Sequence, residues 1–293
     1  MKVAAVDIGT NSMRLLIVDD GVELGRWERV TGLGRGRDAD GTLTSVAMDR
    51  TLLALAEFGG RMSQSGVEKM RAVATSASRD APNRAEFFDK AELALGVRPE
   101  LISGEEEAGF SFAGATTGTS LPPPHMVVDI GGGSTEFVTA EGGVSLELGS
   151  VRLTDRFLPD RPCLPSQLAA SREEVAVQLA TVPRPDGPLS VLGVAGTWTS
   201  LSAMAHLLAS YDRTKVHGSD LSEATLAALL HGLAGLSIED TVAAHPSLDP
   251  ARAPVILAGA VVAEGVFLRL GCHQVTISEH DLLDGVAAEL AAG

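Results

Sequence analysis

The chain has 293 residues, 45% of them hydrophobic and 21% charged, and a formal net charge of -15 at pH 7. This length is enough for two domains with buried cores, and the composition is that of an ordinary soluble globular protein. The excess of acid repels polyanions at long range, which argues against a nucleic-acid partner. Any phosphate ligand must therefore be held by local donors, a few arginines and metal ions.

The cysteines and the most apolar segment indicate a cytoplasmic protein without a membrane partner. Cys163 and Cys272 show no metal-ligand spacing, which favours reduced thiols. Met1 leads directly into an expected strand, so no signal peptide is predicted. The apolar stretch 253–271 is interrupted by Glu264 and Arg269, which favours a buried helix over a membrane span.

The first recognisable unit is VDIGTNSMRLLIVDDG, which starts at Val6 and reads as a β-hairpin. A Gly-rich turn bordered by Ser or Thr presents backbone N–H groups to an anion, because Gly permits close backbone approach. We therefore expect a phosphate-binding turn, and Asp7 at the strand end is placed to hold a divalent cation. The alternative is that Asp7 only hydrogen-bonds its own turn. The predicted phosphate-binding residues of this turn are Gly9, Thr10, Asn11 and Ser12.

The rest of the first half alternates strands and helices. A strand is expected at 26–31, then a Gly-rich loop at 31–42 that lacks the spacing of a dinucleotide fingerprint. Helices are expected at 45–64 and 84–95, with a strand at 70–74 between them. Ser103 is expected to cap a further helix, with Glu106 as its capping-box partner.

The hairpin pattern recurs as VDIGGGSTEFVTAEGG from Val128. The aspartates of the two hairpins, the helical segments that start near Ser45 and Ser166, and the polar turns at Ser76 and Thr197 recur at spacings of 121 or 122 residues. Three anchors at nearly one spacing indicate two homologous α/β halves. The second turn predicts a second phosphate-binding loop, with Asp129 as its cation ligand; its predicted phosphate-binding residues are Gly131, Gly132, Gly133, Ser134 and Thr135.

The second half carries extra, mostly helical sequence before its last strand and helix. A helix begins at the Gly-Thr turn of Gly196 and Thr197, which offers N–H groups to a ligand; the following Trp198 either stacks on that ligand or lies in the core. A Pro-rich loop is expected at 182–188, helices at 221–236, 238–244 and 249–270, and a strand at 275–278. The predicted domains are 1–118 with 281–293, and 119–280 with an insertion at about 215–270.

These segments resemble the exopolyphosphatase/guanosine pentaphosphate phosphatase (Ppx/GppA) family, in the superfamily of actin, hexokinase and heat-shock chaperones. The resemblance covers essentially the whole chain and is specific because of the order of its motifs, whereas DIGGGS alone would indicate only the superfamily. The chain is similar to the short, two-domain form. The motifs that carry the resemblance are DIGTNSMRLLI, ATSASRDAPN, ISGEEEAGFSFAGA, DIGGGSTEF, GVAGTWTSLSAM and SEHDLLDGVAAEL.

The resemblance implies two ribonuclease-H-like (actin-like) α/β domains, duplicated, with an active-site cleft between them. It also implies hydrolysis of a terminal phosphoanhydride, dependence on Mg²⁺ or Mn²⁺, and a homodimer. By motif position Glu107 corresponds to the water-activating glutamate, and Asp129 and Glu136 to acidic residues of the second loop. Asp7 joins them as a predicted metal ligand, and the residues predicted to bind phosphate include Arg14, Ser78 and Arg79.

Several of these side chains have a structural alternative. Glu105 suits the helix dipole and Glu106 the capping box, whereas Glu107 is where the family motif places the base; its structural alternative is a solvated helix face. Arg14 lies in an apolar strand and either binds phosphate or emerges at a sheet edge. Arg79 either binds phosphate or caps the junction between strand and helix. The roles of Lys215, His217 and Arg252 stay open, between an extended anion track and ordinary surface or packing positions.

The favoured function is an exopolyphosphatase that removes terminal phosphate from inorganic polyphosphate. Conversion of guanosine pentaphosphate to the tetraphosphate is the alternative within the same chemistry. A sugar or acetate kinase of the same superfamily is a second alternative, against which the ISGEEEA segment favours activation of water. A nucleotide-binding regulatory or cytoskeletal protein is a third, since fold alone does not exclude it.

Overall fold

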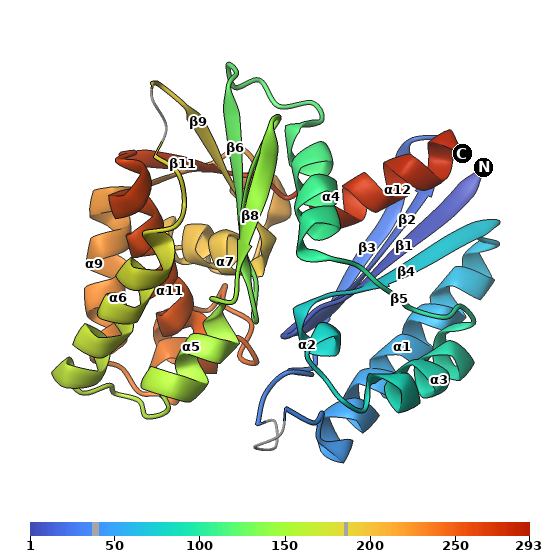
Figure 1. The fold of residues 1–293 in the computed structure, drawn as a ribbon, viewed down its shortest axis with the longest axis horizontal. Coiled ribbons are helices and arrows are strands. Elements are labelled where there is room, and N and C mark those ends of the chain that lie inside the picture. Colours follow the sequence, from blue (N-terminus) through green and yellow to red (C-terminus); the bar gives the residue numbers. More distant parts are fainter. Residues whose placement is uncertain (37–40, 185–186) are drawn as a thin grey trace. The chain divides into compact units, whose positions relative to one another are not determined.

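The computed structural model describes residues 1–36, 41–184 and 187–293, which divide into two compact units (Figure 1). Unit 1 comprises Met1–Gly114 and His280–Gly293, and unit 2 comprises Ala115–Glu279. The boundaries expected from the sequence, 118/119 and 280/281, lie close to these positions. The loops expected at 31–42 and 182–188 lie partly outside the described residues.

Unit 1 is a five-stranded sheet in the order β3-β2-β1-β4-β5 with helices on both faces. The first three strands form an antiparallel meander, and β4 and β5 run parallel to β1. Its elements in chain order are β1 (Lys2–Ile8), β2 (Ser12–Asp19), β3 (Val22–Val30), α1 (Ser45–Ser65), β4 (Lys69–Ala74), α2 (Ser76–Arg79), α3 (Arg84–Leu95), β5 (Glu100–Leu101), α4 (Gly104–Thr116) and α12 (Leu282–Ala292).

Alternation along β1 assigns its side chains to the two faces of this sheet. Ala4, Val6 and Ile8 belong to the apolar cluster under α1 and α3, whereas Val3 and Ala5 pack with α12. The helices lie accordingly on opposite faces (Figure 1). Because Asp7 continues the series of Val3 and Ala5, its side chain lies on the α12 face.

Two glycines allow α4 and α12 to touch backbone to backbone. A Cβ on Gly114 would lie 1.9 Å from the carbonyl oxygen of Asp281, and a Cβ on Gly285 would lie 2.2 Å from that of Phe110. Real Cβ atoms do not approach a carbonyl so closely, so both contacts require glycine. The helix that carries Glu107 is thus seated directly on the helix that returns to unit 1 at the end of the chain.

Unit 2 repeats this plan in a six-stranded sheet of order β10-β11-β9-β6-β7-β8. The meander β6-β7-β8 corresponds to β1-β2-β3, and the parallel strands β9 and β11 take the places of β4 and β5. Its elements in chain order are β6 (His125–Ile130), β7 (Thr135–Thr139), β8 (Gly142–Leu146), α5 (Ser150–Phe157), α6 (Pro165–Leu179), β9 (Ser190–Val194), α7 (Ala195–Ala205), α8 (Arg213–Val216), β10 (Asp220–Ser222), α9 (Glu223–Ala234), α10 (Ile238–Ala244), α11 (Ala253–Leu270) and β11 (Gln274–Ile277).

The shared topology is the ribonuclease-H-like arrangement predicted from the sequence, made twice. The helices expected at 221–236 and 249–270 are shorter in the structure, as α9 and α11, and two larger differences from expectation concern strands. The strand expected at 26–31 begins at Val22, because Asp20 and Gly21 have φ values of 45° and 81° and join β2 to β3 in a tight hairpin turn. The insertion expected to be mostly helical also contains β10, which pairs with β11 and becomes the sheet edge.

The apolar stretch at 253–271 forms α11, the central helix of the unit 2 core. By length and composition alone α11 is long enough to cross a membrane, yet 72% of it is buried inside the protein. Trp198 is fully buried and meets Phe267 of α11 edge to face. Trp198 is therefore a core residue, which was one of its two expected roles.

Candidate functional site

The two predicted phosphate turns have the same backbone closure. The amide of Gly9 donates to the carbonyl of Ser12 at 3.0 Å, and the amide of Gly131 donates to the carbonyl of Ser134, also at 3.0 Å. Each turn links the first two strands of its unit, as the repeated hairpin pattern predicted. Each half of the chain therefore supplies one such turn, which together with the residues around it is called a half-site.

In unit 1 the first turn lies where β1 and β4 end together. These parallel neighbours place their carboxyl ends at one sheet edge, where the amide of Thr75 donates to the carbonyl of Ile8 at 3.2 Å. The segment after β3 packs into the same place, since a Cβ on Gly34 would lie 2.4 Å from the Thr10 methyl group and 3.5 Å from Ala77. Three loops meet at this edge, the usual ligand position in an α/β sheet.

Arg35 is a cation of this half-site that the sequence reasoning missed. Its guanidinium donates to the side-chain oxygen of Asn11 at 2.6 Å, and the amide of Gly34 donates to the carbonyl of Thr10 at 2.9 Å. The sequence of this Gly-rich loop lacks the spacing of a dinucleotide fingerprint, and its alternating Gly and Arg residues are the signal that points to Arg35.

Asp7 and Arg14 are directly opposed partners on β1 and β2. Arg14 donates through Nε and Nη2 to Oδ2 of Asp7, at 3.0 and 2.6 Å. Its Nη1 donates to Asp281 at the start of α12. The structure thus places the predicted phosphate ligand Arg14 between two carboxylates. Burial raises the pKa of Asp7, and the charge and hydrogen bonds of Arg14 oppose that rise.

The three glutamates at the start of α4 separate as their sequence positions suggested. The amide of Ser103 donates to Glu106 at 2.8 Å and the Ser103 hydroxyl accepts from the amide of Glu106, which confirms the capping box. These bonds lower the pKa of Glu106. Glu105 is also exposed, whereas Glu107 is buried, with 8% of its surface accessible.

Glu107 lies against the predicted phosphate ligand Arg79. Nη2 of Arg79 donates to Oε2 of Glu107 at 3.0 Å and to the carbonyl of Ile102 at 3.1 Å. A carboxylate and a guanidinium in contact supply both a proton acceptor and an anion-binding group. Unit 1 therefore places the predicted base Glu107 in contact with the predicted phosphate ligand Arg79.

Buried polar atoms without a hydrogen-bond partner gather around the same loops. Among the residues that the structure describes, these atoms include Oδ1 of Asp7, Oγ of Ser78 and Nε of Arg79. An unpaired buried polar atom is costly, and such atoms in a native structure point to a ligand, ion or ordered water. The set contains acceptor and donor groups, which suits a hydrated anionic ligand.

In unit 2 the corresponding pair of residues is doubly acidic. Asp129 and Glu136 face each other on β6 and β7, at the place that Asp7 and Arg14 occupy in unit 1. They are 6% and 1% exposed, and Ser145 of β8 donates its hydroxyl to Glu136 Oε1 at 2.7 Å. Two carboxylates on adjacent strands repel each other, and a divalent cation offsets this repulsion.

The second turn is seated on the start of α5. The amides of Ser150 and Val151 donate to the carbonyls of Gly131 and Gly132 at 2.9 and 2.8 Å, and Arg152 donates from Nε to the carbonyl of Gly133 at 3.0 Å. Arg152 is a second cation that sequence reasoning missed. The predicted phosphate ligand Thr135 is fully buried and donates its hydroxyl to the carbonyl of Leu148, so its side chain serves to hold the turn.

The start of α7 lies at the same sheet edge as Asp129. Val194 is the parallel partner of Asp129, and the helix begins immediately afterwards with Ala195, whose φ is 68°. A Cβ on Gly196 would lie 2.0–2.2 Å from the guanidinium atoms of Arg252. Arg252, whose role the sequence left open, is therefore buried against the backbone that precedes Thr197.

The other two open assignments belong to a different part of unit 2. Lys215 is exposed and pairs with Asp212 at 3.6 Å, and Nδ1 of His217 accepts from the amide of Glu279 at 3.1 Å. Both are in surface or packing positions. Within residues 1–36, 41–184 and 187–293 no group of three or more His, Cys, Asp or Glu side chains forms a metal site, so the predicted set of Asp7, Asp129 and Glu136 stays a prediction.

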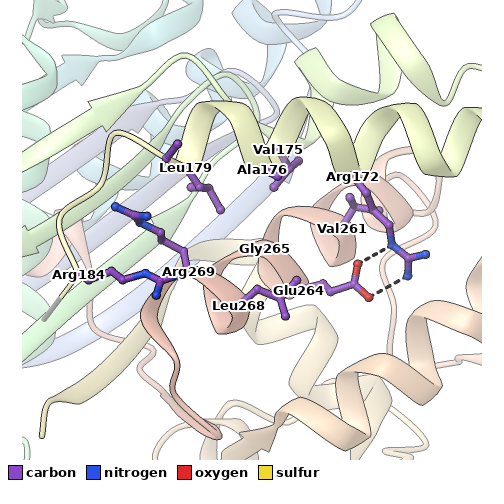
Figure 2. Close-up of a pocket in the computed structure, with 11 residues that line it drawn as sticks. Arg172, Val175, Ala176, Leu179, Arg184, Val261, Glu264, Gly265, Leu268 and Arg269 are labelled. Carbon is purple, nitrogen blue, oxygen red and sulfur yellow. Dashed lines mark hydrogen bonds and ion pairs between the residues drawn. The ribbon is translucent and has the colours of Figure 1, made fainter.

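An apolar pocket of unit 2 contains none of the predicted site residues. It has a volume of about 380 Å³ and lies between α6 and α11. Figure 2 shows Arg184 and Arg269 at one end and the ion pair of Arg172 and Glu264 at the other. Its apolar walls, formed by residues such as Leu179 and Leu268, do not suit a polyphosphate.

Two units of one ribonuclease-H-like topology, each with a Gly-Ser turn at a strand end, define the class of actin-like phosphate-handling proteins. The model of the Ppx/GppA phosphatase family matches residues 18–292, and the chain belongs to this family of phosphoanhydride hydrolases. This membership sets aside the kinase and cytoskeletal alternatives.

Individual relatives agree over the whole chain. The chain is 40% identical to Exopolyphosphatase 2 of Mycobacterium tuberculosis, over 99% of this chain and 98% of the relative. A crystal structure of an exopolyphosphatase-like protein superposes with a TM-score of 0.93 at 35% identity, covering 99% of this chain and 98% of that one. The PPX-GPPA enzyme of Aquifex aeolicus superposes with a TM-score of 0.82 at 29% identity, covering 99% of both chains.

Proposed function

We propose that this protein is a metal-dependent exopolyphosphatase that hydrolyses the terminal phosphoanhydride of inorganic polyphosphate. The observation that carries the proposal is the burial of Glu107, alone among three consecutive glutamates, in contact with Arg79. The substrate is inferred from the relative in Mycobacterium tuberculosis, which is named an exopolyphosphatase. Guanosine pentaphosphate remains the alternative substrate because the family as a whole includes both activities.

The reaction needs a water to be deprotonated and directed at a terminal phosphorus. In the proposal Glu107 accepts the proton, and Arg79 turns from Glu107 to bind oxygens of the terminal phosphoryl group. In unit 1 the amides of the first Gly-Ser turn donate to other phosphate oxygens. In unit 2 the second Gly-Ser turn and Arg252, beside Gly196, offer their own amide donors and positive charge to phosphate.

Asp129 and Glu136 are the residues that fit a divalent cation, since they are buried, adjacent and both acidic. Mg²⁺ or Mn²⁺ held there supplies neutralising charge for the phosphate oxygens. Opposite Asp7 stands Arg14, whereas Glu136 stands opposite Asp129. This difference favours Asp129 and Glu136 over Asp7 as direct ligands of the cation.

Phosphate release tests the base. Purified full-length chain is incubated with Mg²⁺ and either polyphosphates of defined length or guanosine pentaphosphate. Glu107→Gln is expected to lower kcat at least about 100-fold, the usual contribution of a general base. The matched control is Glu105→Gln, two residues earlier and exposed, which is expected to keep wild-type activity. Activity retained in Glu107→Gln would remove the base assignment, and release from guanosine pentaphosphate alone would replace the substrate.

Metal binding is tested without turnover. Mg²⁺ is expected to raise the Tm of the wild type in a concentration-dependent way, because a ligand that binds only the folded state stabilises it. Glu136→Gln is expected to lose most of this shift, and Glu141→Gln, an exposed neighbour in the β7–β8 turn, is expected to retain it. An equal shift in all three proteins would place the cation elsewhere. Homodimer formation and a cytoplasmic location stay predictions from the sequence.

A further inference from the structure

A chain of charged side chains in unit 1 connects the last helix to the first phosphate turn. Arg14 bridges two carboxylates, with Nε and Nη2 on Oδ2 of Asp7 and Nη1 on Oδ2 of Asp281. The side chains of Asp7 and Asp281 are both 6% exposed and that of Arg14 is 15% exposed. The bridge is therefore largely shielded from water. Hydrogen bonds between charged groups are strongest in such shielded positions.

Asp281 is a fixed anchor for this bridge. Its Oδ1 accepts from the amide of Leu283 at 3.0 Å and caps α12, while Asp284 accepts from the amide of Asp281 at 2.8 Å. Arg26 of β3 donates to Asp284 at 2.6 Å and lies 3.9 Å from Asp281. The backbone of Asp281 also rests on Gly114 of α4. Because hydrogen bonds hold both the backbone and Oδ1 of Asp281, its other carboxylate oxygen, Oδ2, is fixed so that it points toward Arg14.

The consequence falls on Asp7. Both of its hydrogen bonds from Arg14 go to one oxygen, Oδ2, and they fix the rotation of the carboxylate. The other oxygen, Oδ1, is buried and has no hydrogen-bond partner among the described residues. It lies beside the first turn, since a Cβ on Gly9 would be 3.9 Å from Oδ2 and 4.0 Å from Oδ1. Burial raises the pKa of the Asp7 carboxyl, and the charge and hydrogen bonds of Arg14 offset part of that rise.

We propose that Asp281 is a positioning residue for the reaction: it holds Arg14 so that Arg14 orients Asp7 in the first phosphate turn. The kinetic part of this inference rests on the proposed phosphatase function. Arg14 then acts as a spacer between two carboxylates and does not bind substrate directly. The unit 2 hairpin has Glu136 in the place of Arg14, so the bridge is specific to the first half of the duplication.

Asp281→Asn separates the bridge from the helix cap. Asparagine caps helices about as well as aspartate. If its side-chain oxygen keeps the bond from Leu283, its amide nitrogen must face Arg14, and two donors then meet. The substitution therefore keeps α12 in place while it breaks the contact to Arg14. The matched control is Asp284→Asn, whose side-chain oxygen can still accept from the amide of Asp281 while its amide nitrogen faces Arg26; it therefore removes a charge from the same helix turn and keeps the cap, and it does not touch Arg14.

Steady-state kinetics of phosphate release from polyphosphate gives the first readout. Asp281→Asn is expected to lower kcat about tenfold or more, with KM within about twofold of the wild type, whereas Asp284→Asn is expected to stay within about twofold in both. A purely structural role would instead lower the active fraction of both variants in proportion to their loss in Tm. Equal kcat values for the wild type and Asp281→Asn would overturn the proposal.

Crystal structures of the wild type and of Asp281→Asn give a second readout that needs no turnover. The variant is expected to show Arg14 turned away from residue 281 and the Asp7 carboxylate rotated. Unchanged Arg14 and Asp7 side chains in the variant would refute the positioning role. If the wild type releases no phosphate from any substrate tested, the proposed function is wrong. The comparison of the Arg14 and Asp7 side chains in the two crystal structures then still tests whether Asp281 positions them.

Discussion

The contact between α4 and α12 predicts that two glycines of one helix respond to alanine with opposite signs. A Cβ on Gly114 would lie 1.9 Å from the carbonyl oxygen of Asp281, 2.8 Å from its carbonyl carbon and 3.1 Å from the amide nitrogen of Gly285. All three atoms are backbone, so no flexible side chain can move aside. Gly109, in the same helix, has no atom within 4 Å of the corresponding position.

The magnitudes follow from overpacking and helix propensity. Forcing α4 and α12 apart costs about 1–3 kcal/mol, because it disturbs the contacts of Leu283 and Val286 with the sheet. Replacing a helical glycine with alanine raises the free energy of unfolding by up to about 1 kcal/mol, because alanine has the higher helix propensity. Gly114→Ala is therefore expected to lower the free energy of unfolding by about 1–2 kcal/mol, and Gly109→Ala is expected to raise it by up to about 1 kcal/mol.

Differential scanning calorimetry of the full chain measures both variants. A change of 1 kcal/mol in the free energy of unfolding shifts the Tm of a domain of 100–200 residues by roughly 2–8 °C. Hydrogen exchange of the peptide that covers α12 locates the effect, since faster exchange is expected there in Gly114→Ala. A Gly114→Ala protein as stable as Gly109→Ala would refute the backbone contact between α4 and α12.

Two further predictions concern unit 2. Burial raises the pKa of Cys272 from 9.0 to about 11, so at pH 8 the folded protein holds roughly 100-fold less thiolate at this position than the unfolded chain. Alkylation of Cys272 by iodoacetamide is therefore expected to be slow in the folded protein, to become faster as the pH rises to about 11, and to become faster in urea. Equal alkylation rates in the folded and unfolded protein would contradict the burial of this thiol. Arg252→Gln is expected to raise KM for polyphosphate about tenfold or more, because it removes a buried cation beside Gly196. The control Arg184→Gln, in the pocket between α6 and α11, is expected to leave KM unchanged. An equal rise in KM for both variants would indicate an effect of long-range charge instead.

The sequence predicted the features that depend on local pattern. The two turns close through backbone atoms three residues apart, and the Gly and Ser positions that permit this closure are visible in the chain itself. The Ser103–Glu106 capping box is local in the same sense. The duplication was also readable, because the repeated segments keep one spacing.

The features that were missed depend on tertiary contacts. Arg14 reads as a phosphate ligand because it follows the first turn, yet its partner Asp281 is 267 residues away along the chain. Arg252 reaches Gly196 only because α11 crosses the start of α7. The side-chain type and the local spacing carry no information on such contacts, since the crossing of two helices is set by the packing of the whole core.

The assignment of residues 280–293 to unit 1 has a consequence for synthesis on the ribosome. Leu282, Leu283 and Val286 complete the apolar cluster that covers Val3, Ala5 and Leu16. While the nascent chain is still short of these residues, that side of the first sheet has no helix α12 to shield it. Unit 2 is contiguous and is translated in full before that point, so the domain whose synthesis begins first is the last to obtain all of its parts.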